Sequence, residues 1–457
     1  MKMTKYILFL VLATLLISSC KMGENYSRPE IEAPHSFVFS YGDTTYNEAM
    51  KWWDLFNDPV LDTLIKKALE NNKDLLATAQ NVEAARLQLA IQKADLWPQF
   101  NYSGAAGRGN FQMLKLPEPT NNFSLVGQAS WEIDFWGKLR RMNESAKAQY
   151  LASEYGLNAL RLSLITTVAT TYFQVMEFNT KAIIAEQTYE IRDSSYKILK
   201  HRFEAGIIPA IDVNHSRIQK AIAATAIPVY KRNAAQSVNL LSVLLGENPK
   251  PLIIENKLDS FTAAPLIPPG LPSDLLNRRP DIMMAEQQLV SQNALVGVAK
   301  AARLPSLSLT GMFGLASDDL STITSGDPAW SISGSLLGPI FNWNKNSNRV
   351  KAEKARAVAA IYQYENTILN AFREVEDALI TIETLKEEEA AIQEHVEAAV
   401  EAAILSGDRY DKGIASYIEF LESQRQAFDA QMSQTSNKQD LLEAYVKLYQ
   451  ALGGGWQ

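Results

Sequence analysis

The sequence predicts a mainly α-helical protein with a β-barrel part, in which one structural unit occurs twice. Three observations predict this fold. Similar stretches recur at a constant distance along the chain, two helical runs are several times longer than an average helix, and two pairs of segments alternate between apolar and small polar residues, as strands do. The repeated unit is expected to contain a helix, a β-hairpin, a long helix and a shorter returning helix.

Each half of the chain matches the other when the sequence is shifted against itself by 207 residues. The matched pairs include Asp74 with Asp281, Pro98 with Pro305, and Gly246 with Gly453. A constant offset over so much of the chain indicates a duplication. We therefore expect a first structural repeat at 60–246 and a second at 274–457. Residues 247–273 contain six prolines and are expected to connect the two repeats.

The first nineteen residues have the features of a secretory signal peptide. Lys2 and Lys5 precede an apolar run from Tyr6 to Ile17, and small residues follow. Cys20 is the only cysteine and stands where a bacterial lipoprotein signal is cut, so we expect residues 1–19 to be removed and Cys20 to be lipidated. With this anchor, residues 20–59 are expected to form a linker from the lipid to the first repeat. The alternative is a soluble exported protein with an incidental cysteine.

Two β-hairpins are predicted, at about 98–136 and about 305–342. In both stretches, alternate positions contain aromatic and aliphatic residues, and the positions between them contain Ser, Asn, Gln or Thr. This alternation suits a sheet with lipid on one face and water on the other. The alternative is an amphipathic hairpin that covers a soluble helical core.

The helices that follow the hairpins are unusually long. No proline interrupts 138–204, which would span about 100 Å at 1.5 Å per residue, and 346–410 is its counterpart. A coiled-coil spacing of alternating fours and threes links Ile368, Phe372, Val375, Leu379 and Ile382. Shorter helices are expected to return after tips at about 203–211 and about 410–417.

Four strands per chain are too few to close a membrane barrel by themselves. After residue 20, no segment is long and apolar enough to span a membrane as a helix, so a membrane-spanning form would need a closed β-barrel. The smallest such barrels have about eight strands. A barrel would therefore be shared between copies of the chain.

Composition argues against an enzyme and against a nucleic-acid partner. The formal net charge of −7 disfavours binding to a phosphate backbone. With four histidines and one cysteine, the sequence offers no Cys/His zinc site, iron–sulfur centre or disulfide framework. It also lacks an HExxH motif and a glycine-rich phosphate loop. We expect no catalytic residue, cofactor or bound metal, and His201 and His215 beside one tip are the alternative metal ligands.

Three motifs carry a family resemblance. They are Arg278–Ile282 followed by Ala285-Glu286, Asp58-Pro59 followed by Leu61 and Leu64, and the tip sequences from Arg202 to Val213 and from Arg409 to Glu419. With these motifs, essentially the whole chain resembles TolC-like outer-membrane efflux proteins, and most closely the lipoprotein group that serves resistance-nodulation-division pumps.

The resemblance implies a homotrimer with twelve strands in one outer-membrane barrel and a long α-helical barrel across the periplasm. The implied function is a passive exit duct for drugs or other toxic small molecules. The implied partners are a periplasmic membrane-fusion adaptor and an inner-membrane pump. The chain would lie in the outer membrane, anchored by its lipid and extending into the periplasm.

The resemblance also implies a periplasmic gate. The matching positions are Asp212, Tyr410, Glu419 and Glu422, and in a trimer the two glutamates would form two carboxylate rings. The alternative is a solvated helix surface. Some family members place a basic residue where this chain has Ala415, so the ionic partner of the gate is left to nearby basic residues, namely Arg202, Arg409 and Lys412.

The two tips are the expected docking surface for the adaptor, and the alternative is ordinary loop packing. The candidate residues are Gly206, Ile207, Ile208, Gly413 and Ile414. Two other functions remain open at this point. One is the outer-membrane duct of a type I protein-secretion system, and the other is a periplasmic coiled-coil adaptor or structural lipoprotein.

Overall fold

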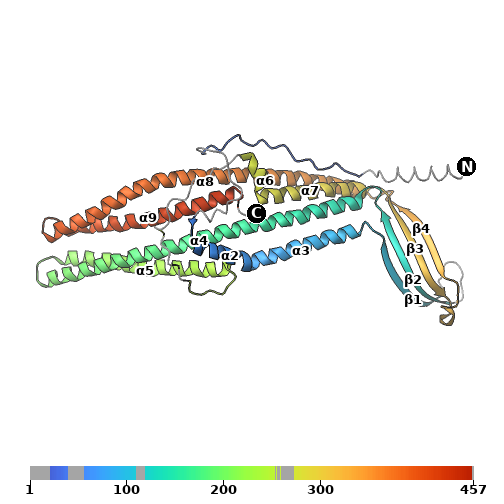
Figure 1. Cartoon of the computed structure of the whole chain (residues 1–457), viewed down its shortest axis with the longest axis horizontal. Helices are drawn as coiled ribbons and strands as arrows, with labels where there is room; N and C mark the ends of the chain where they lie inside the picture. Colours follow the sequence, from blue (N-terminus) through green and yellow to red (C-terminus); the bar gives the residue numbers. More distant parts are fainter. Residues whose placement is uncertain are drawn as a thin grey trace. The chain divides into compact units, whose positions relative to one another are not determined.

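A computed structural model describes residues 21–39, 56–109, 119–252, 254, 258 and 272–454. The expected signal peptide, Cys20 and most of the proline-rich connector lie outside these residues. Figure 1 traces the chain and labels its helices and strands.

The first repeat begins with the short helix α2 (Pro59–Asn71) and continues with two strands and three further helices. Its elements are α3 (Lys73–Ala94), β1 (Gln99–Gly109), β2 (Thr120–Ile133), α4 (Lys138–Glu204) and α5 (Ala210–Leu244). The second repeat has the same order. Its elements are α7 (Pro280–Ala301), β3 (Ser306–Ser317), β4 (Ala329–Leu337), α8 (Lys345–Asp411) and α9 (Tyr417–Ala451), with α6 (Leu275–Arg278) before them.

The duplication predicted from the sequence is confirmed in the element boundaries. Both long helices have 67 residues, and both returning helices have 35. The helices α8 and α9 begin 207 positions after α4 and α5, respectively. Single hydrogen bonds also repeat. The Asn72 side-chain amide donates to the carbonyl of Leu244, and the Arg279 guanidinium, 207 positions later, donates to the carbonyl of Ala451.

The compact units of the structure do not coincide with the two repeats. One unit contains residues 1–31, 80–155 and 283–366, and the other contains 32–79, 156–282 and 367–457. Each unit therefore combines segments of both repeats, and α3, α4, α7 and α8 contribute to both units.

The first unit contains a four-stranded antiparallel sheet in the order β1-β2-β3-β4. Pro98 and Pro305 lie between the preceding helices and the strands β1 and β3, where a residue without a backbone N–H ends a helix. The β2–β3 pairing joins the two repeats, so β1 and β4 form the edges of the sheet.

The second unit is helical and has an apolar core. Leu61 and Ile65 of α2, Val168 and Tyr172 of α4, and Val446 of α9 are fully or almost fully buried in it. Asp58 caps α2 by accepting from the amides of Val60 and Leu61, and it also accepts a 2.6 Å bond from the Tyr172 hydroxyl. The Asp58-Pro59 motif therefore fixes where the folded helical part begins.

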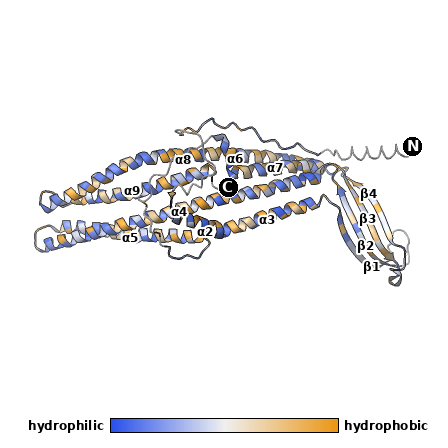
Figure 2. Ribbon diagram, viewed as in Figure 1, coloured by the Kyte–Doolittle hydropathy of each residue, from blue (hydrophilic) through white to orange (hydrophobic). Residues whose placement is uncertain are grey.

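The coiled-coil stripe predicted on α8 is correct at three of its five positions. Ile368, Val375 and Ile382 are buried, but Phe372 and Leu379 are only partly buried. Ala371 and Ala378 complete the buried stripe instead. Polar and apolar residues alternate along all the long helices (Figure 2). Within the described ranges, no helix combines the length and the apolar character of a membrane span.

Candidate functional site: the hairpin tips, the sheet face and the amino-terminal segment

Both helical hairpins turn at a glycine in the left-handed region. The φ angles are 73° at Gly206 and 72° at Gly413, a conformation that side chains with a Cβ rarely adopt. The amide of Ile207 donates to the carbonyl of Arg202, and that of Ile414 donates to Arg409, both at 2.9 Å. These bonds close the last turns of α4 and α8 in the manner of a Schellman motif.

The predicted docking isoleucines do not share one environment. Ile207 is 71% exposed and Ile414 is 65% exposed, whereas Ile208 is partly buried against a cluster that contains Leu199, Tyr417 and Leu421. The sequence analysis missed two other exposed isoleucines, Ile211 and Ile418. They are 207 positions apart, so the repeat itself was the signal that could have found them.

Tyr410 belongs to an aromatic cluster on the second tip. Its ring centroid lies 5.3 Å from that of Tyr417 and 6.1 Å from that of Phe420. Burial raises the pKa of the Tyr410 hydroxyl, and Arg202 partly offsets this effect. Burial also raises the pKa of Tyr417 to about 12.

Arg202 links the two hairpins. Its guanidinium carbon lies 5.7 Å from the centroid of the Tyr410 ring, within cation–π range, and one of its nitrogens lies 3.4 Å from a carboxylate oxygen of Asp411. Asp212, in the first turn of α5, acts electrostatically on both Tyr410 and Tyr417. The structure therefore brings Asp212, Tyr410 and Arg202 together, although they come from both repeats.

Glu419 and Glu422 are both exposed, and both have basic partners. Glu419 lies 3.3 Å from the Arg409 guanidinium. Glu422 accepts hydrogen bonds from Arg425, which hold the pKa of its carboxyl below the usual range. Of the three basic candidates, Arg409 pairs with a predicted gate carboxylate and Arg202 contacts Tyr410. In the described part of the chain, no group of three or more His, Cys, Asp or Glu side chains gathers as metal ligands would.

The sheet has one apolar and one polar face, as predicted. On the apolar face, two aligned rows run across all four strands. They are Phe100, Ala129, Gly311 and Ile332, and Tyr102, Gly127, Phe313 and Trp330. Small residues between the rings leave a shallow apolar groove of about 630 Å³. On the other face, the side chains of Ser308 and Ser335 bond at 2.7 Å.

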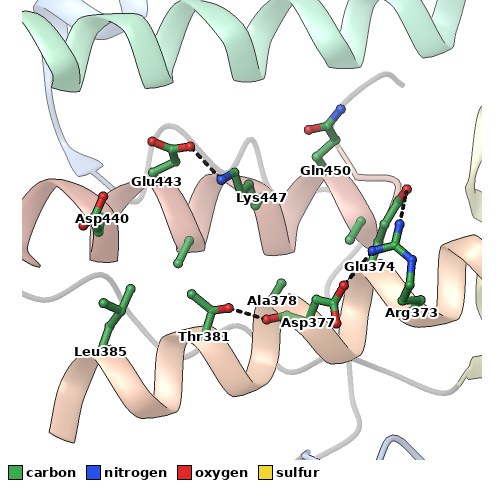
Figure 3. Close-up of a pocket in the computed structure, with 12 residues that line it drawn as sticks. Arg373, Glu374, Asp377, Ala378, Thr381, Leu385, Asp440, Glu443, Lys447 and Gln450 are labelled. Carbon is green, nitrogen blue, oxygen red and sulfur yellow. Dashed lines mark hydrogen bonds and ion pairs between the residues drawn. The ribbon is translucent and has the colours of Figure 1, made fainter. Parts of the chain in front are cut away.

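A polar groove of about 600 Å³ lies between α8 and α9 (Figure 3). Its charged side chains are four acidic and two basic ones, namely Glu374, Asp377, Asp440, Glu443, Arg373 and Lys447. Arg373 pairs with Asp377 at 2.6 Å, and Lys447 pairs with Glu443 at 2.7 Å. This surface is suited to contact with water and carries more acidic than basic groups.

A fully buried arginine holds the amino-terminal segment, which the sequence analysis did not single out. The Arg141 guanidinium donates to the carbonyls of Met22, Gly23 and Glu24 at 2.6–3.0 Å and to Glu144 at 2.9 Å. Farther along, Glu286 accepts bonds from Arg28 and from the Tyr26 hydroxyl, and burial raises the pKa of that hydroxyl. The chain just after residue 20 is therefore held in one place.

Comparisons with known proteins agree with this arrangement. The family model described as outer membrane efflux protein matches twice, at 64–247 and at 271–454. The chain is 34% identical to the antibiotic efflux pump outer membrane protein ArpC of Pseudomonas putida, over 99% of this chain and 96% of that protein. It is 32% identical to the cation efflux system protein CusC of Escherichia coli, over 97% of each. The solved structure of the outer-membrane channel OprN superposes with a TM-score of 0.89 at 29% identity, covering 96% of this chain and all of that one.

Proposed function

Because the chain belongs to the outer membrane efflux protein family, we propose that three copies of it form the exit duct of a tripartite efflux system in the outer membrane. The observation that carries the proposal is the sheet, whose apolar face is exposed in the single chain and whose two edges are β1 and β4. Three such sheets joined edge to edge supply twelve strands. That number suffices for a closed barrel with lipid outside and water inside.

The duct is passive in this proposal. Charged side chains in the groove between α8 and α9 pair with each other, so the helices offer cargo a wet wall and no tight site. The relative ArpC is named for the efflux of antibiotics, and the relative CusC is named for the efflux of cations. We assign to this chain the export of small toxic molecules that an energised inner-membrane pump, of the resistance-nodulation-division type, selects.

The hairpin tips dock a periplasmic membrane-fusion adaptor. Ile207, Ile211, Ile414 and Ile418 supply exposed apolar surface on both tips, and the buried core of a protein interface is more apolar than the rest of the surface. Gly206 and Gly413 set the turns that present them. Ile208 supports this surface from the cluster beneath.

The periplasmic gate consists of Asp212, Tyr410, Glu419 and Glu422. Arg202 and Arg409 moderate its charge, because each contacts one of these residues in the single chain. In three copies, the carboxylates attract cations to the axis, as rings of acidic side chains do in cation channels.

Lipid anchoring at Cys20 adds to the membrane contact of the sheet. The Arg141 clamp is consistent with an anchor at Cys20, because it fixes Met22, Gly23 and Glu24, which lie two to four positions after that cysteine. Mass spectrometry of the mature amino terminus should find a lipidated cysteine at position 20, and an unmodified terminus elsewhere would contradict the anchor alone.

Deletion of the gene and complementation test the proposed duct. Cells without the protein should accumulate more of an exported dye, and the wild-type chain should restore low accumulation. The variant Trp330→Glu with Ile332→Glu should fail to restore it, because a charge on a lipid-facing position near the membrane centre destabilises a membrane barrel.

The matched control is Ser331→Glu with Ser333→Glu, which places the same charges on the polar face of the same strand. This control should assemble and restore export. Equal behaviour of the two double variants would contradict the assignment of the apolar face to lipid.

A further inference from the structure

The contacts that join the two repeats inside one chain also specify how one copy joins the next. The registers of the two hairpins are identical after the offset, since Gln99 pairs with Ser130 and Ser306 pairs with Leu337, each 207 positions later. The β2–β3 ladder joins the first repeat to the second. In a ring of copies, the second repeat is followed by the first repeat of the next chain, so the same joint must recur there.

We propose that β4 of one copy pairs antiparallel with β1 of the next copy in the register of the β2–β3 ladder, shifted by the repeat. This inference rests on the proposed trimer and adds its contacts. Within the chain, Gln128 faces Met312 and Ala129 faces Gly311. In the shifted register, three β4 residues of one copy face β1 residues of the next: Gly334 faces Ala106, Ser335 faces Ala105, and Leu336 faces Gly104.

The shifted register keeps each face of the sheet continuous. Leu336 and Gly104 both lie on the apolar face, and Ser335 and Ala105 both lie on the polar face. A register displaced by one residue would instead turn one strand over and place serines in lipid. The proposed pairing is therefore the one that both the duplication and the hydrophobic effect favour.

The end of β4 is incomplete in the single chain. β2 continues to Ile133, but β4 ends at Leu337, three residues before the counterpart of Ile133. That counterpart is Ile340, which is fully exposed. In the shifted register it faces Phe100 of the next copy, so β4 extends by residues 338–340 when the copies join.

Trp343 gives a second, independent sign of the same joint. Its counterpart Trp136 donates its indole N–H to the carbonyl of Pro305 at 2.8 Å across the two repeats. Trp343 is 80% exposed, and its φ of 47° lies in the left-handed region, which Trp136 does not adopt, so the backbone at Trp343 must change when the copies join. The counterpart of Pro305 is Pro98, so Trp343 donates to the Pro98 carbonyl of the next copy.

The turn before each proline supports this assignment. The amide of Trp97 donates to the carbonyl of Ala94, and the amide of Leu304 donates to Ala301, both at 3.0 Å. Because the same turn precedes both prolines, the carbonyls of Pro98 and Pro305 occupy equivalent positions in the two repeats.

The helices beside the sheet fit the same joint. Ser145 of α4 and Ser291 of α7 are buried and bond to each other at 2.8 Å. Their counterparts are Ala352 of α8 and Ala84 of α3, and both are exposed in the single chain. Two small residues allow the same close approach of helices between copies.

Disulfide trapping tests the register. Cys20 is the only natural cysteine and stays in every variant. The test variant carries Ser335→Cys with Ala105→Cys, whose Cα atoms should lie about 4.5–5.5 Å apart across the joint, within reach of a disulfide. The controls combine Ser335→Cys with Ser103→Cys or with Gly107→Cys, each displaced by two residues on the same face.

On non-reducing gels of oxidised outer membranes, the test variant should form covalent trimers at least about tenfold faster than either control. A displacement of two residues adds about 6.6 Å along the strand, which takes the thiols out of range. Faster trapping of a control would overturn the register and leave the proposed duct intact. If the wild-type protein migrates as a trimer but no variant is trapped, the β4–β1 joint is wrong. If the wild-type protein is a monomer, the proposed function is wrong as well.

The variant Trp343→Phe tests the indole contact separately. It should lower the temperature at which the trimer dissociates in detergent, while the retained ring preserves the apolar packing. An unchanged dissociation temperature would refute the hydrogen bond from Trp343 to Pro98.

Discussion

Replacement of the buried clamp should free the amino-terminal segment without unfolding the rest of the protein. In Arg141→Met, a side chain of similar length fills the site but cannot donate to the carbonyls of Met22, Gly23 and Glu24. A hydrogen bond to a charged donor contributes about 1.5–3 kcal/mol. Because the three bonds share one guanidinium and are not additive, we expect a loss of about 4 kcal/mol in the free energy that keeps this segment closed.

A loss of about 4 kcal/mol corresponds to an opening equilibrium about a thousandfold larger, at about 1.4 kcal/mol per factor of ten. Hydrogen exchange measured by mass spectrometry on the peptide covering residues 21–31 should detect this change. The amide of Met22, which donates to the carbonyl of Trp136 at 3.1 Å, should lose its protection first.

The matched control is Arg356→Met, which removes an exposed arginine that pairs with Glu353 in the same compact unit. An exposed pair of this kind contributes about 0–1 kcal/mol, so exchange of residues 21–31 should stay unchanged. Equal protection in Arg141→Met and in the wild type would refute the clamp.

Three further predictions concern the hairpin tips. Ile207→Asp with Ile414→Asp should weaken binding of the purified adaptor at least about tenfold in a surface-based binding assay, because each change places a charge on an apolar contact, and unchanged affinity would place the docking surface elsewhere. Glu419→Ala with Glu422→Ala should weaken the block of single-channel current by divalent cations in planar bilayers, and an unchanged block in an assembled trimer would favour a solvated helix surface. The raised pKa of Tyr417 means that its stabilising effect is complete below pH 10 and is lost as the pH rises through about 12, so the alkaline destabilisation seen by circular dichroism in the wild type should be smaller in Tyr417→Phe.

Sequence patterns predicted the helices and strands well because both repeats carry the same local signals. Gly206 and Gly413 mark the tips, and Pro98 and Pro305 mark the starts of the hairpins. The alternation along the strands was sufficient to assign their faces, since side chains in a strand alternate with period two.

Contacts between distant segments were harder to predict. Nothing local distinguishes Arg141 from the exposed arginines, because it shares an i,i+3 glutamate with several of them, and the backbone carbonyls that it also binds lie more than 100 positions away in the chain. The buried stripe of α8 uses Ala371 and Ala378 where the spacing favoured Phe372 and Leu379, because the spacing identifies apolar positions but not which of them face the neighbouring helices. The separation of Ile207 from Ile208 likewise depends on the aromatic cluster beneath the tip.

Native mass spectrometry of the purified, detergent-solubilised protein tests the central claim most directly. The account predicts a complex of three chains, because a sheet of four strands has two edges to pair and cannot close on itself. A stable single chain in detergent that retains its full β content would contradict the shared barrel and, with it, the proposed exit duct.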